Sequence, residues 1–164
     1  GSKVRGRGEE VMKTELDVLD QLKRIIAEKL GSYLEEEGDL PSIDEHTILI
    51  DFPDVDSMRR QSMIYIQPDY ESLEPISVLS DLATMHITLF ILCKGAASEK
   101  LIRRVFSYYT GLYCLLRSNQ SLDGFVDFLS ITDMDYYPSV TASSSVSAIE
   151  VKINIQWTKD FEKN

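Results

Sequence analysis

The sequence predicts an α+β fold, a two-layer sandwich in which a mostly antiparallel sheet of four to five strands carries two helices on one face. The first observation is an alternation near the C-terminus, where odd positions from 149 to 157 are apolar and even positions between them are polar. Side chains alternate between the faces of a strand, so this segment predicts a sheet with one face buried and the other in contact with solvent. The second observation is helical spacing of apolar residues in two segments, 11–37 and 98–117. Dry faces must be buried against each other, which gives two layers in the order αβββαββ.

The first helix is expected to run from Val11 to about Glu37. Gly38 ends the pattern, and Pro41 follows as a normal terminator. Apolar residues repeat through this segment at steps of three and four: Leu16, Leu19, Ile26, Leu30 and Tyr33.

Two short β-rich runs, 47–51 and 62–67, are expected to pair as a hairpin. The polar segment 54–61 between them is long enough to leave the sheet. Residues 69–81 contain four acids and a proline, and they are expected to form a loop with one irregular strand at 76–79.

Residues 82–94 form the most apolar run and are expected to be a central strand, buried on both faces toward its end. Gly95 breaks this strand. Ser98 is the expected N-cap of the second helix, which should end near Arg117.

A long strand is expected at 125–137, ended by Pro138. The connector 139–147 is nearly all Ser, Thr, Ala and Val, a composition typical of a flexible loop between hairpin strands. It leads into the closing strand, 147–157.

The chain of 164 residues, 43% of them hydrophobic, is large enough for one core without disulfides or metal. We expect a single domain at 11–158, preceded by a disordered tail at 1–10 and followed by a loose tail at 159–164. Gly1 and Ser2 are typical of the scar that remains after cleavage of an expression tag.

Acidic residues dominate the charge, with 27 Asp and Glu against 17 Lys and Arg and a formal net charge of −10. This charge argues against a surface that grips duplex phosphates by releasing counterions. It remains compatible with DNA passing nearby, because an acidic wall repels the polymer. No run approaches the ~20 apolar residues that span a bilayer, and no leader pattern opens the sequence, so a soluble, cytosolic protein without membrane partners is expected.

Cysteine and histidine give little support for catalysis or metal binding. Cys93 and Cys114 lie in apolar patterns and are expected to be buried free thiols. His46 and His86 are far apart in sequence, without a Cys or His at ligand spacing. We therefore expect no catalytic residue, no metal and no cofactor.

Two clusters of aspartates resemble functional sites, one a cation site and the other a pair of catalytic carboxylates. Asp51, Asp54 and Asp56 suggest cation ligands, but the Gly and distal Glu of a calcium loop are missing. Asp133 and Asp135 alternate on one strand face, and no nucleophile is placed beside them, so a solvated face is the simpler interpretation.

The C-terminal half resembles the tail terminator and tail-completion (head-tail joining) proteins of long-tailed bacteriophages. The resemblance depends on four segments: the helix-closing run 112–116, the turn 121–126, the Tyr-Tyr-Pro at 136–138 and the strand at 148–157. It concerns the order of elements and the placement of turns. Segments 35–44 and 69–81 depart from the family pattern.

The resemblance implies a virion structural protein that forms a ring, usually a hexamer, which ends the tail tube and joins it to the head connector. Its partners would be copies of itself, tail-tube and connector proteins, with DNA passing through the lumen unrecognised. Its location would be the virion tail, assembled in the host bacterial cytoplasm. The residues expected at partner interfaces lie in loops and on the polar strand face: Arg59, Arg60, Tyr137, Pro138, Ser139, Val140, Thr141, Glu150, Lys152 and Asn154.

Two other functions stay open at this point. One is a protein-interaction adaptor that acts as a monomer or dimer, and the other is a small α+β enzyme. Arg59 and Arg60 are compatible with phosphate binding as well as with simple loop charge.

Overall fold

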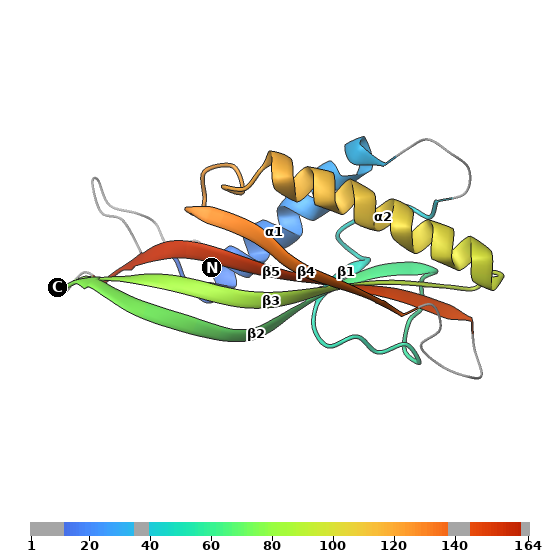
Figure 1. Cartoon of the computed structure of the whole chain (residues 1–164), viewed down its shortest axis with the longest axis horizontal. Helices are drawn as coiled ribbons and strands as arrows, with labels where there is room; N and C mark the ends of the chain where they lie inside the picture. Colours follow the sequence, from blue (N-terminus) through green and yellow to red (C-terminus); the bar gives the residue numbers. More distant parts are fainter. Residues whose placement is uncertain (1–11, 35–39, 138–144, 162–164) are drawn as a thin grey trace.

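The computed structural model describes residues 12–34, 40–137 and 145–161. This part of the chain forms two layers, with helices on one face of a single five-stranded sheet (Figure 1). The predicted α+β two-layer class is therefore confirmed. The elements are α1 (Glu15–Lys29), the 3-10 helix η1 (Leu30–Tyr33), β1 (Ile48–Ile50), β2 (Ser62–Ser77), β3 (Ser80–Lys94), α2 (Ser98–Ser118), β4 (Phe128–Tyr137) and β5 (Val146–Asp160).

The strand order is β1-β2-β3-β5-β4, and every neighbouring pair is antiparallel except β1 and β2. The expected hairpin between 47–51 and 62–67 is thus wrong, because Ile48 pairs in parallel with Ile64. A parallel pair needs a long connection. Segment 51–61 supplies it by crossing the sheet face that the helices leave open (Figure 1).

This crossing segment packs closely, whereas the sequence suggested a polar loop that leaves the sheet. Met58 is 4% exposed and contacts a second, smaller apolar cluster on the open face. Lys94 Nζ donates a hydrogen bond to the Met58 carbonyl. The cluster also includes Met63, Tyr65, Leu92, Val146 and Ala148.

The largest correction concerns residues 69–81, expected to be loop. Strand β2 continues through them to Ser77, and β3 begins at Ser80, so the two strands form one long hairpin. Register shifts occur at Pro68/Tyr70 and Pro75/Ser77. Strand β1 pairs with β2 only as far as Ile66, and proline is tolerated where a strand edge has no partner.

Helix α1 begins later than the expected start at Val11. Thr14 caps it, with its Oγ1 accepting from the Asp17 amide at 3.2 Å and Asp17 Oδ2 accepting from the Thr14 amide at 2.9 Å. This capping box satisfies two orphan amides and fixes the start. The expected end near Glu37 is wrong, because α1 ends at Lys29, η1 ends at Tyr33 and the Leu34 backbone is extended.

Other boundaries shift by a few residues. Ala97, not Ser98, is the N-cap of α2, and no side chain caps this end. Strand β4 starts at Phe128 instead of 125, because residues 119–125 form a tight loop with positive φ at Leu122, Asp123 and Gly124. Strand β5 extends to Asp160, two residues into the segment expected to be a loose tail.

The main core lies between the helices and the sheet. Odd-numbered residues of β5 from 147 to 157 are all buried, as the alternation predicts. Trp157 is 1% exposed, and its Nε1 donates to the Lys13 carbonyl at 3.2 Å. On the other side of the core, the Tyr108 hydroxyl of α2 donates to the Pro41 carbonyl. These bonds tie the segment before α1 and the segment before β1 to the core.

Candidate interaction surface

A hairpin arm, residues 69–82 of β2 and β3, extends beyond β1 and carries exposed apolar side chains. It ends at the tip of the sheet, where the Phe161 amide, just after β5, donates to the Leu79 carbonyl (Figure 1). Val78 in the turn is 99% exposed. Three more apolar side chains of the arm are about half exposed: Leu73, Ile76 and Leu79. Contiguous exposed apolar residues of this kind mark an interaction surface.

The outer edge of β2 adds to this surface. Within the described residues, β2 has no partner strand on that side beyond Ile66. At a rise of about 3.3 Å per residue, residues 67–77 leave about 36 Å of open strand edge. Open edges offer unpaired amides and carbonyls to another chain.

An ion cluster fixes the arm to the first turn of α1. Lys159 Nζ lies 2.6 Å from Glu15 Oε2 and 3.6 Å from Glu71 Oε2. Partial burial opposes ionisation of Glu15, but the hydrogen bond and charge of Lys159 outweigh it and hold the Glu15 pKa below its usual value. Burial and the charge of Glu15 raise the pKa of Glu71, whose Oε1 is buried without a hydrogen bond. The cluster therefore orients the arm at some electrostatic cost.

The charge of the arm is one-sided. Residues 69–82 contain four acids and no Lys or Arg. Glu71 is engaged by the ion cluster and Asp69 accepts hydrogen bonds from Thr88 Oγ1 and Gln67 Nε2. Near the tip, Glu74 is exposed and Asp81 is half-buried opposite Lys159, and neither carboxylate has an ion pair or hydrogen bond in the described part of the chain.

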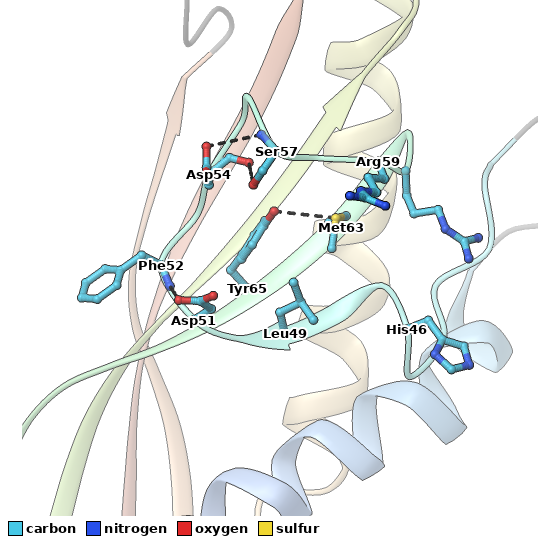
Figure 2. A pocket seen from close by; sticks show the side chains of 10 residues that line it. His46, Leu49, Asp51, Phe52, Asp54, Ser57, Arg59, Met63 and Tyr65 are labelled. Atoms are coloured by element: carbon cyan, nitrogen blue, oxygen red, sulfur yellow. Dashed lines mark hydrogen bonds between the residues drawn. The ribbon is translucent and has the colours of Figure 1, made fainter.

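The second candidate surface is the β1 pocket, a depression of about 430 Å³ beside β1 (Figure 2). Its lining combines apolar and charged side chains from β1, the crossing segment and the start of β2: His46, Leu49, Asp51, Phe52, Asp54, Ser57, Arg59, Arg60, Met63 and Tyr65. Figure 2 shows Leu49, Met63 and Tyr65 grouped together, with Phe52 pointing away. The Tyr65 hydroxyl reaches Met63 Sδ at 3.6 Å, and burial raises the Tyr65 pKa.

The two aspartates that line the β1 pocket accept hydrogen bonds from nearby backbone amides. Asp51 Oδ1 accepts from the Phe52 amide at 2.7 Å, and Asp54 Oδ1 accepts from the Asp56 amide at 3.2 Å. These turn-forming bonds explain Asp51 and Asp54, two of the three aspartates that resembled cation ligands. Within the described residues, no group of three or more His, Cys, Asp or Glu side chains could hold a metal ion.

The arginines of the β1 pocket are exposed and lack an ion-pair partner in the described part of the chain. Arg59 and Arg60 line the pocket from the segment that leads into β2, and Figure 2 labels Arg59 there. Two unpaired guanidinium groups above an apolar floor favour an acidic partner with apolar side chains.

Four of the other expected interface residues, Tyr137, Glu150, Lys152 and Asn154, lie on the open sheet face, away from the β1 pocket. Lys152 Nζ donates to Thr88 Oγ1 at 3.1 Å, and the Tyr137 hydroxyl donates to Glu150 Oε2 at 3.3 Å. The charge of Glu150 raises the Tyr137 pKa. Asn154 is half-buried opposite His86. Internal bonds thus engage most of this polar face.

Tyr137 and Glu150 line a separate depression of about 290 Å³, with Pro53, Val55, Phe90, Leu92 and Ala148. The expected interface residues Pro138, Ser139, Val140 and Thr141 lie outside the described residues. The structure therefore places the described members of the predicted set at two locations: the arginines at the β1 pocket, and Tyr137, Glu150, Lys152 and Asn154 on the open face.

The cysteines differ from expectation in one case. Cys93 is buried, and burial raises its pKa to about 11. Cys114 is exposed on α2, contrary to the prediction of two buried thiols. It lines a shallow groove of about 710 Å³ with residues that include Arg103 and Phe106.

Sequence reasoning missed the arm as a functional element. A signal was present: Val78 and Leu79 occupy a turn between two serines, where Gly, Asn or Asp is usual. His86 lies on the open face of β3, stacked on Tyr70 at the base of the arm with ring centroids 4.0 Å apart.

No protein-family model matches the chain, and no curated protein matches its sequence. Among solved structures, a chain from the structure titled "Virion of native gene transfer agent (GTA) particle" is similar over 85% of this chain and 96% of that chain, with a TM-score of 0.45 and 9% sequence identity. In the described part of the chain, neither α1 nor α2 combines the length and apolar character needed to cross a membrane.

Proposed function

We propose that this protein is a structural subunit of a phage-like tail, which associates with copies of itself into a ring that ends the tail tube and joins it to the head connector. The observation that carries the proposal is the presence of two unlike exposed surfaces on one rigid sheet. The arm is apolar and acidic, whereas the β1 pocket is concave and rimmed by arginines. Contacts between unlike surfaces repeat head to tail and give a ring when the rotation closes.

The sequence resemblance in the C-terminal half supports the tail role within this class of assemblies. The net charge of −10 is compatible with DNA passing through such a ring, because an acidic lumen prevents the polymer from binding. The tail tube and head connector are the other partners that this function implies.

An enzyme is less well supported than an assembly subunit. The charged groups Glu15, Glu71 and Lys159 form an ion cluster, and the pKa of each is shifted. They fix the arm to α1 and line none of the three depressions described above. Perturbed pKa values arise in structural ion pairs as well as in active sites.

The exposed arm also suits an adaptor that binds one unrelated protein as a monomer or dimer. Native mass spectrometry of the pure chain, from low to high micromolar concentration, separates this alternative from the ring. We expect one discrete oligomer whose fraction increases with protein concentration, and which appears as rings in negative-stain images. A monomer that persists at the highest concentration would refute the ring and leave the adaptor.

A further inference from the structure

We propose that the arm of one copy binds in the β1 pocket of the next copy, with the acids near the arm tip facing Arg59 and Arg60. This inference rests on the proposed self-assembly and names its contact. The two surfaces involved are residues 69–82 and the β1 pocket.

The turn of the arm supplies the apolar part of the contact. A hairpin turn that serves only to reverse the chain usually carries Gly, Asn or Asp. Here Val78 is 99% exposed and Leu79 is 47% exposed, between Ser77 and Ser80. Val78 is uncovered and Leu79 is half covered in the described chain, and the β1 pocket is lined by the apolar side chains of Leu49, Met63 and Tyr65.

Charge complementarity identifies the occupant as a second copy. The arm contributes Glu74 and Asp81, with no Lys or Arg from 69 to 82. The pocket contributes Arg59 and Arg60, while its own Asp51 and Asp54 are already bonded to backbone amides. Opposite charges brought together at a partly desolvated contact attract more strongly than they do in water.

One copy cannot make this contact with itself. The arm tip lies at one end of the sheet, beside Asp160 of β5, whereas β1 pairs with β2 at residues 64–66, nearer the other end (Figure 1). Residues 67–77 of a straight strand cover about 36 Å of that separation. The contact must therefore form between copies, as a head-to-tail interface.

The groove on α2 is a weaker candidate for the arm. Its Arg103 already lies 3.7 Å from Glu99, one turn earlier on the helix. Arg59 and Arg60 have no such partner in the described residues, so the acidic arm gains more at the β1 pocket.

Charge reversal tests the contact. The pocket variant R59E/R60E and the arm variant E74K/D81K should each remain monomeric at concentrations where the wild-type chain assembles. An equimolar mixture of the two should assemble again, because each altered arm then meets a pocket of opposite charge. R103E/R117E changes net charge by the same amount as the pocket variant, on exposed positions of α2, and should assemble like wild type.

Sedimentation velocity at low and high salt gives the readout, with circular dichroism to verify folding. Wild-type rings together with an assembled R59E/R60E variant would overturn this inference and leave the proposed function standing. A monomeric wild-type chain would overturn both. If either double variant fails to fold, V78D decides in its place, because a fully exposed turn position does not affect folding and its charge would block the apolar contact.

Discussion

Gly111 lies in the middle of α2, where the helix crosses η1, and its replacement by alanine separates two opposing effects. A Cβ at this position would lie 2.7 Å from Leu34 Cδ2 and 3.2 Å from the Tyr33 carbonyl oxygen. Alanine is favoured over glycine inside a helix by up to about 1 kcal/mol. Overpacking of a close contact costs about 1–3 kcal/mol. The Leu34 side chain can rotate away, but the Tyr33 backbone must shift with the whole of η1.

We expect Gly111→Ala to lower the free energy of unfolding by about 1 kcal/mol, since the steric cost exceeds the helical gain. For a chain of this size the melting temperature should fall by about 2–4 °C. Urea unfolding followed by circular dichroism measures the change. The matched control is Gly31→Ala in η1, where a Cβ meets nothing within 4 Å and the reduced freedom of the unfolded chain should stabilise the protein. An increase in stability for Gly111→Ala would refute the claim that α2 and η1 are in tight contact.

Three further predictions concern the core and the arm. Trp157→Phe should lower the free energy of unfolding by about 1–2 kcal/mol, because the ring is smaller and the donor to the Lys13 carbonyl is lost. Circular dichroism should follow this unfolding, since the substitution removes the one Trp of the chain and with it the Trp fluorescence. Burial raises the pKa of Glu71 in the folded state, so protonation of its carboxylate stabilises the fold. This stabilisation sets in as pH falls through the folded pKa and is complete below the unfolded value of 4.5. The stability advantage of wild type over Glu71→Gln in urea unfolding should therefore grow toward acid pH, and a constant difference would contradict the assignment. A thiol reagent should label Cys114 in the native protein and Cys93 only after unfolding, as mass spectrometry would show.

The core strand and the two-layer class follow from the sequence because burial on one side imposes a period of two. Strand β5 separates the main core from the open face, so Ile149 through Trp157 alternate as the geometry requires. The same reasoning located both helices. It failed for Cys114, since α2 has a broad apolar stripe in sequence but buries only part of it, and Tyr113 next to Cys114 is 41% exposed.

The arm could not be predicted because no core enforces an alternation there. From 72 to 77 every residue of β2 is exposed, so neither face selects apolar side chains, and two prolines conceal the strand. Only some of the residues that line the β1 pocket could be predicted from the sequence. Arg59 and Arg60 stand out as a pair, but His46, Leu49 and Tyr65 meet them only because β1 and β2 run parallel, which no local pattern specifies.

The ion cluster at the base of the arm explains how an exposed hairpin can serve as a binding element. An isolated two-stranded hairpin is marginally stable in water, and ordering one upon binding reduces affinity. Here β5 pairs with β3 as far as Ser80, and the Phe161 amide donates to the Leu79 carbonyl, so a third strand backs the arm up to its turn. Lys159 of that strand connects the arm to Glu15 and Glu71. The arm is thus ordered before it meets a partner. Lys159→Met should therefore weaken assembly while leaving the apolar tip and the arginine pocket unchanged, and sedimentation of this variant beside V78D would separate loss of arm order from loss of the contact itself.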